Sequence, residues 1–259
     1  CQPFRLRRQQ HRKHLAMDIL DLNIRITAAA RFDTDASVGG KPLKAALQQQ
    51  SGQDPRRFSR LSLLAALGAN LLKPIRPVAP DCAVYTAAPF SSPSVFEKMT
   101  DNVLNHAAAM PFDFIANLHN APSFHAAQML GSSGATVFVP ADNRPNRQFY
   151  PLLAAALSLH AGGQAAVGWC YEHHAGYPCT REGSIWLLLE HGATTGAVVR
   201  VKRRDAPDPQ EKRRADAYYW QDVCGWLNGQ PEKERVLAAG GWDVLVGAAD
   251  FPMAQDKIG

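Results

Sequence analysis

The apolar residues of the chain recur with two spacings, one typical of strands and the other of helices. Residues 18–26 alternate apolar and polar side chains, which predicts a strand. Residues 55–73 carry Phe and Leu at intervals of three and four, so these side chains share one face of a predicted helix that Pro74 ends. This is the strongest helical pattern in the sequence.

Shorter apolar runs, separated by Gly and Pro, complete the pattern. Further helices are predicted at 93–109, closed by Pro111, and at 122–131, 148–160, 215–228 and 231–239. Further strands are predicted at 82–88, 136–140, 165–172, 184–192 and 242–249, with 197–201 as a candidate hairpin partner of 184–192. Strands that alternate with helices imply an α/β fold with a mixed, mostly parallel sheet covered by helices. The charged, proline-containing residues 203–217 are interpreted as a linker.

Basic residues exceed acidic ones, but the excess lies at one end of the chain. The sequence has 28 Lys and Arg against 23 Asp and Glu, a formal net charge of +5. Residues 1–16 hold five of the bases and no acid, which leaves 23 of each sign in residues 17–259. A neutral body gives no support for nucleic-acid binding. We interpret residues 1–16 as a translated leader, an expression remnant or a mobile arm, outside the fold.

Features that the sequence lacks narrow the functional classes. No stretch reaches the roughly 18–20 continuous apolar residues of a membrane span, so no integral membrane contact is expected. The five cysteines are scattered and without paired spacing, which favours the reducing cytoplasm over a disulfide framework. The phosphate-binding patterns GxxxxGK(S/T) and GxGxxG and the nucleophile elbow GxSxG are absent, so nucleotide enzymes and serine hydrolases have little support.

Two clusters of side chains carry groups that bind metals or transfer protons. The first contains Cys170, Glu172, His173, His174 and Cys179. Its spacing matches no common zinc pattern, so we expect a buried thiol beside solvated histidines and no metal site. The second cluster contains His119, Asn120 and His125 without a paired acid or nucleophile. Here we expect Asn120 and Ser123 to cap the following helix and His125 to pack.

Two groups of basic residues are candidates for binding an acidic protein. They are Arg56, Arg57 and Arg60 in the first turns of the helix at 55–73, and Lys202, Arg203 and Arg204 around the start of the predicted linker. Charge complementarity steers an acidic partner toward such a group. The alternative is that these side chains are simply solvated.

An ordered set of motifs resembles the N-terminal half of a β-ketoacyl synthase over residues 18–201. The motifs are DPRRFSRLSLLAALGA, VYTAAPFSSPSVFEKM, MPFDFIANLHNAPSFHAAQMLGSSGATVFVPA, AAVGWCYEHH and GSIWLLLEHG. The part at 111–134 is the most specific. The likeness is greatest to the short "β-ketoacyl synthase-like, N-terminal domain" proteins, the chain length factors of aryl-polyene and related polyene systems. Each motif alone is weak, and their common order carries the resemblance.

The departures from that family pattern concern catalysis. In active synthases the strand after the LGxxG motif leads to a nucleophilic cysteine, and the position counted from Gly134 is Asn143 here. An amide cannot attack a thioester as an activated thiolate does. The HGTGT and NxFG motifs of the second half of a synthase are also absent. The resemblance therefore implies a subunit with no catalytic residue and no cofactor, inactive by itself.

The resemblance also implies an architecture and partners. Residues 17–202 would form half of a thiolase fold, and residues 203–259 a linker with a truncated C-terminal helix-strand extension. One half alone would leave apolar layers exposed, so the expected partner is a full-length catalytic β-ketoacyl synthase in a heterodimer or higher heteromer. An acyl carrier protein is expected to dock on this complex.

The segment before the HNA-like motif would face the partner's active site and limit the growing acyl chain. Its candidate tunnel residues are Met110, Phe112, Phe114, Ile115 and Leu118. The alternative is that Phe112 and Phe114 fill the core. A second functional hypothesis is an enzyme, a decarboxylase or acyltransferase, that uses Asn143, His119 or His125 on carrier-protein thioesters. The missing cysteine and the missing second half favour the accessory subunit.

Overall fold

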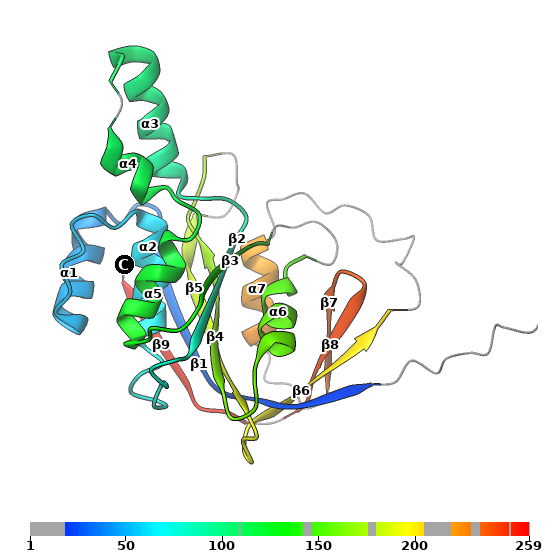
Figure 1. Cartoon of the computed structure of the whole chain (residues 1–259). Helices are drawn as coiled ribbons and strands as arrows, with labels where there is room; N and C mark the ends of the chain where they lie inside the picture. The colour runs from blue at the N-terminus through cyan, green and yellow to red at the C-terminus, as the bar shows by residue number, and fades with distance from the viewer. Residues whose placement is uncertain are drawn as a thin grey trace, which may run out of the picture.

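The computed structural model describes residues 19–108, 110–141, 147–175, 180–204, 219–228, 234–248 and 250–258. These residues build one nine-stranded sheet in the order β3-β2-β4-β5-β1-β6-β8-β7, with β9 paired to β1 (Figure 1). The strands are β1 (Leu20–Asp35), β2 (Ala83–Ala88), β3 (Thr136–Pro140), β4 (Gln164–Tyr171), β5 (Arg181–His191), β6 (Ala197–Arg203), β7 (Arg235–Ala239), β8 (Trp242–Val246) and β9 (Met253–Ile258).

The sheet contains both parallel and antiparallel strand pairs. The pairs β2–β3, β2–β4 and β1–β9 are parallel, and the other five pairs among the described strands are antiparallel. The predicted α/β class, with a mixed sheet covered by helices, is confirmed. Antiparallel pairs are more numerous than the strand order along the sequence suggested, because the long central β1 is flanked by β5 and β6, which both run against it.

Two predicted elements are wrong, and strand pairing explains both. The strands at 184–192 and 197–201 do not form a hairpin, because β1 lies between β5 and β6. Residues 235–239 were expected to be helical but form β7, since pairing with β8 outweighs the helix preference of their Leu and Ala side chains. The C-terminal strands β7, β8 and β9 thus belong to the same sheet as the central strand β1.

Three further elements lie outside the predicted ones. α1 (Gly40–Ser51) buries only Leu43 and Leu47, so its helical pattern is faint. α4 (Pro111–Ala116) begins at the proline that was expected only to close the preceding helix, because proline fits the first turn. β9 alternates exposed and half-buried residues and is formed by its parallel pairing with β1.

Helices cover both faces of the sheet. The remaining helices are α2 (Arg60–Asn70), α3 (Pro93–His106), α5 (Ala121–Leu130), α6 (Tyr150–Ser158) and α7 (Tyr219–Asn228). Figure 1 shows α1, α2 and α5 on one face and α6 and α7 on the other. On the second face, Tyr219, Trp220 and Val223 of α7 are buried with the side chains of β4 and β5. The expectation that a half-fold leaves an apolar layer uncovered is therefore wrong for this face.

α2 packs closely against β5. Nine of the eleven residues of α2 are buried, far more than one helical face. A β-carbon at Gly68 would lie 2.9 Å from Cδ1 of Trp186 and closer still to Oγ of Ser184, so only glycine permits this approach. The contact fixes α2, and with it the basic residues that precede it, against the sheet.

α3 and α4 form a projection that we call the arm, residues 93–118. Figure 1 shows it standing away from the sheet, beyond the end of α2 and α5. Pro93 is the only buried residue of α3, and α4 has none. In the part of the chain that the structure describes, no helix is long and apolar enough to cross a membrane.

Candidate functional site

The arm and the start of α5 carry a concentration of exposed apolar side chains. Nine of the fourteen large exposed apolar residues in the described chain lie between residues 96 and 124. They are Phe96, Val103, Leu104, Met110, Phe112, Phe114, Ile115, Leu118 and Phe124. Single exposed apolar residues are ordinary, whereas a set gathered on one projection marks an interaction surface. We call this set the arm surface.

All five candidate tunnel residues belong to the arm surface. Phe112 and Phe114 are 62% and 61% exposed, so the alternative that they fill the core of this chain is wrong. α4 is too short to bury them, and the ion pair between Lys98 of α3 and Asp113, 3.0 Å apart, ties it to the rest of the arm. The phenylalanines are thus available to a partner or to an acyl chain.

A hollow of about 770 Å³ lies between the arm, the loop before α2 and the start of α5. Its wall brings together two groups of candidates that are distant in sequence. Phe112, Ile115 and Leu118 line it from the arm, and Arg56, Arg57 and Arg60 line it from the loop and first turn of α2. The guanidinium carbon of Arg57 lies 4.8 Å from the centre of the Phe112 ring, a cation–π contact that joins the two groups.

The three arginines at this hollow differ in what they can offer a partner. Arg60 is largely buried and forms an ion pair with Glu182 of β5, with Nε 2.6 Å from Oε1, so it belongs to the interior of the fold. Arg56 pairs with the exposed Asp54 through Nε and Oδ2, 2.7 Å apart. Arg57 has no carboxylate partner among the described residues. It is therefore the arginine best placed to bind an acidic group.

The second basic group lies elsewhere. Lys202 and Arg203 end β6, and Arg204 follows it and pairs with Asp243 of β8. Figure 1 shows β6 at the lower right of the view, away from the arm at the upper left. The structure therefore does not join the two basic groups into one surface.

The described residues of the first sequence cluster, Cys170, Glu172, His173 and His174, form no group of metal ligands. The described residues contain no group of three or more His, Cys, Asp and Glu side chains that would hold a metal ion, and Cys179 lies outside them. Cys170 is fully buried, and burial raises the pKa of its thiol, which disfavours the thiolate that a metal needs. Glu172 instead accepts hydrogen bonds from the residues at the start of α3.

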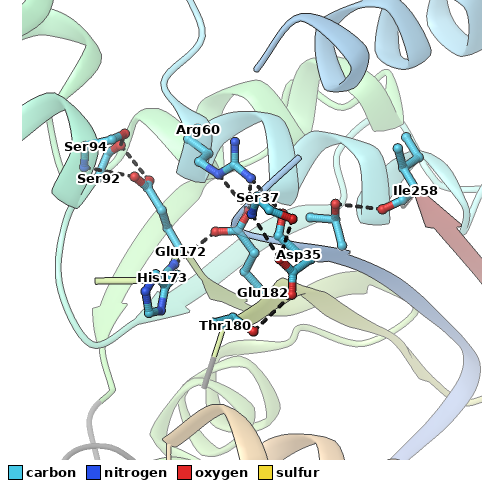
Figure 2. A network of polar contacts seen from close by, with 11 residues as sticks. Asp35, Ser37, Arg60, Ser92, Ser94, Glu172, His173, Thr180, Glu182 and Ile258 are labelled. Carbon is cyan, nitrogen blue, oxygen red and sulfur yellow. Dashed lines mark hydrogen bonds and ion pairs between the residues drawn. The ribbon is translucent and has the colours of Figure 1, made fainter. Parts of the chain in front are cut away.

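Glu172 belongs to a polar network at the end of β4 that sequence analysis missed (Figure 2). Its carboxylate accepts a hydrogen bond from Ser92 Oγ at 2.6 Å and from the backbone N–H of Ser94 at 2.9 Å. Beside it, Glu182 accepts from the backbone N–H of His173 at 3.0 Å and pairs with Arg60. The one sequence signal for this network is Ser92 before Pro93, a common helix start.

The histidines of the second cluster pack rather than pair with a nucleophile. His125 stacks on Phe58 with ring centres 3.7 Å apart, and burial lowers the pKa of its imidazole. His119 meets Phe138 edge-on at 5.4 Å. Asn120 occupies the N-cap position before α5, but its side chain makes no capping hydrogen bond, and Ser123 donates to Val137 O instead. The expected cap is therefore wrong, and the expected packing of His125 is confirmed.

β3 forms one edge of the sheet. Within the described chain it pairs only with β2, and its residues Thr136 to Val139 are half-buried. An apolar, unpaired strand edge is available for pairing with another chain. Asn143, three residues beyond β3, lies outside the described residues.

Comparison with solved structures identifies the fold. No family model matches the chain, and no curated protein matches it. A chain of the ketosynthase ApeO in complex with its chain length factor ApeC, from Xenorhabdus doucetiae, is similar at 18% identity with a TM-score of 0.53. That likeness covers 89% of this chain and 98% of that one. The ishigamide ketosynthase/chain length factor is similar at 13% identity with a TM-score of 0.53, over 72% and 69% of the two chains.

This chain has a ketosynthase fold. The thiolase-type architecture that the sequence motifs implied is thereby confirmed. In this ketosynthase fold the exposed apolar residues gather on the arm and the start of α5, and β3, the strand that leads toward Asn143, is one of the two edges at the ends of the strand order.

Proposed function

We propose that this chain is a non-catalytic subunit of the chain length factor kind, which pairs with a catalytic β-ketoacyl synthase in polyene-type chain elongation. The observation that carries the proposal is the arm surface: large apolar side chains on a projection that its own core does not use. The fold supports it, because a structure with this fold is a complex of a ketosynthase with its chain length factor. The amide side chain of Asn143, at the position of the synthase nucleophile, supports a role without condensation chemistry.

The proposed complex uses two surfaces of this chain. The arm surface packs against the partner synthase, and the free edge of β3 pairs with the partner's sheet, which removes an edge that would otherwise invite aggregation. An obligate interface of this kind buries roughly 2,000 Å² or more in total. The hollow beside Arg57 and Arg56 is the proposed docking position for an acidic acyl carrier protein.

Co-expression with a catalytic β-ketoacyl synthase from the same genome tests the pairing. We expect one heteromeric peak in size-exclusion chromatography and a dissociation constant below about 1 µM. Phe112→Asp should weaken binding at least about tenfold, because it places a charge in an apolar interface. Val236→Asp is the matched control: Val236 is as exposed as Phe112 but lies on β7, away from the arm, and should leave binding unchanged. Binding weaker than micromolar for the wild-type pair would contradict the proposal.

We further propose that Phe112 and Phe114 limit the length of the acyl chain. Because neither side chain supports the core, Phe112→Ala and Phe114→Ala should leave the chain folded and the complex assembled. The product, measured by mass spectrometry, should lengthen by whole extension units. Two intact complexes that give a product of unchanged length would place the limit outside this segment.

A further inference from the structure

The helices of the arm bury almost no side chain against the body of the protein. Pro93 is the only buried residue within its helices. The contact between Lys98 and Asp113 lies inside the arm. The contacts of Arg57 with Phe112 and of Glu97 with His174 are made at the surface. The position of the arm therefore depends on how its first turn is attached.

Glu172 makes that attachment. It follows β4 directly, is 1% exposed, and reaches the first turn of α3 across 80 residues of sequence. One carboxylate oxygen accepts from Ser92 Oγ, and the other accepts the backbone N–H of Ser94, which has no acceptor inside the helix. Ser92 occupies the capping position, but its own side chain does not cap α3. The sheet thus supplies the cap that the helix lacks.

The surroundings of Glu172 hold its carboxylate in place. Glu182 from β5 and Arg60 from α2 form an ion pair beside it, and the backbone N–H of His173 bonds to the same Glu182 (Figure 2). Phe90 lies three residues before α3, and Tyr171 lies directly before Glu172. Their ring centres are 6.4 Å apart. A rigid strand end therefore presents the carboxylate to a helix with almost no apolar anchor.

We propose that Glu172 is a positioning residue, which sets the arm in the orientation that the partner synthase binds by capping α3 from β4. The proposal rests on the proposed function for the identity of the partner, while the capping itself is a property of this chain alone. An apolar interface needs a preorganised surface, since ordering a mobile segment on binding lowers affinity. Loss of the cap should therefore loosen the arm first and weaken partner binding as a result.

Hydrogen exchange on the full chain without a partner tests the cap directly. Glu172→Ala should raise the exchange of amides in α3 and α4 about tenfold or more, because both hydrogen bonds of the cap are lost, and leave β4 and β5 unchanged. Glu172→Gln should stay within about threefold of wild type, since its amide can accept from Ser94 N–H and donate to Ser92 Oγ. Glu97→Gln is the control: it removes the exposed 4.0 Å contact of the same helix with His174 but keeps the cap, and it should stay close to wild type.

Three outcomes would overturn the proposal. They are an arm that exchanges normally in Glu172→Ala, equal loosening of the arm and the sheet, and a Glu172→Gln variant as loose as Glu172→Ala. If Glu172→Ala does not fold, Ser92→Ala removes one of the two hydrogen bonds and should give an intermediate, arm-confined increase. In the complex, Glu172→Ala should weaken partner binding about tenfold. If the wild-type chain binds no synthase while the Glu172 variants show the expected exchange pattern, the proposed function is refuted and the cap is still supported.

Discussion

α2 and α3 are consecutive helices in the chain, and they are stabilised in opposite ways. α2 buries nine of its eleven residues and is capped by Ser59, whose side chain accepts from the N–H of Ser62. α3 is longer, buries only Pro93, and takes its cap from Glu172 on a distant strand. α2 is therefore held in place by the core, whereas α3 is held by a polar contact at its N-terminal end. A helix of the second kind leaves its apolar residues for another molecule.

The largest expected effect separates the two helices by their contribution to stability. Leu64→Ala in α2 removes a fully buried side chain beside the sheet and should lower the free energy of unfolding by about 2–5 kcal/mol. Leu104→Ala in α3 removes the same atoms from a side chain that is 75% exposed, and it should change the free energy of unfolding by less than about 0.5 kcal/mol. Urea denaturation of the isolated chain measures both. Similar losses for the two variants would mean that α3 is also part of the core.

The elements that are buried in the core, as α2 is, were largely predictable from the sequence. Its strands and helices carry continuous or periodic apolar residues, and burial follows from that pattern. α1 was missed because two buried leucines make a weak period, and β9 because its pairing with β1, not its composition, makes it a strand. Pro111 was interpreted as a helix end, although proline begins helices equally well.

The candidate site was predictable only in part. The resemblance pointed to residues 110–118, but their exposure follows from the packing of α4, which no local pattern reveals. Glu172 was noticed as a metal-ligand type, and its real partners, Ser92 and Ser94, lie about 80 positions earlier. Arg60 resembles Arg57 in the sequence, yet its ion pair with Glu182 holds it against β5 with its side chain largely buried. Long-range polar contacts of this kind have no periodicity.

A smaller effect should distinguish the hollow at the arm from the basic end of β6. Arg57→Glu should slow the association of an acidic acyl carrier protein with the complex by about three- to tenfold at low salt and flatten its salt dependence. Arg203→Glu, a reversal in the other basic group, should leave the rate unchanged. Arg57→Gln separates loss of the charge from its reversal. Stopped-flow association over a salt series measures all three, and equal rates for every variant would remove carrier docking from this hollow.

The smallest expected effect is a pH dependence of the arm that α2 should not share. Burial is the main cause that raises the pKa of Glu172, and the nearby charge of Glu182 adds to it, while the hydrogen bonds from Ser92 and Ser94 oppose it. A released arm would expose Glu172 and return its pKa to the ordinary range. The capped arm therefore binds the proton more tightly, and the cap is strongest below the ordinary pKa and weakens as pH rises through the raised one.

The comparison of wild type with Glu172→Gln isolates this titration, because the amide imitates the protonated acid at every pH. After correction for intrinsic exchange, the ratio of arm exchange rates, wild type over Glu172→Gln, should rise with pH. Other charged groups face the same region, namely Glu182 and Arg60 on the sheet side and His173, His174 and Glu97 near the arm. A parallel series in Glu97→Gln removes the 4.0 Å contact between Glu97 and His174. A ratio that stays constant, or one that changes equally in α2, would mean that Glu172 does not set the pH response of the arm.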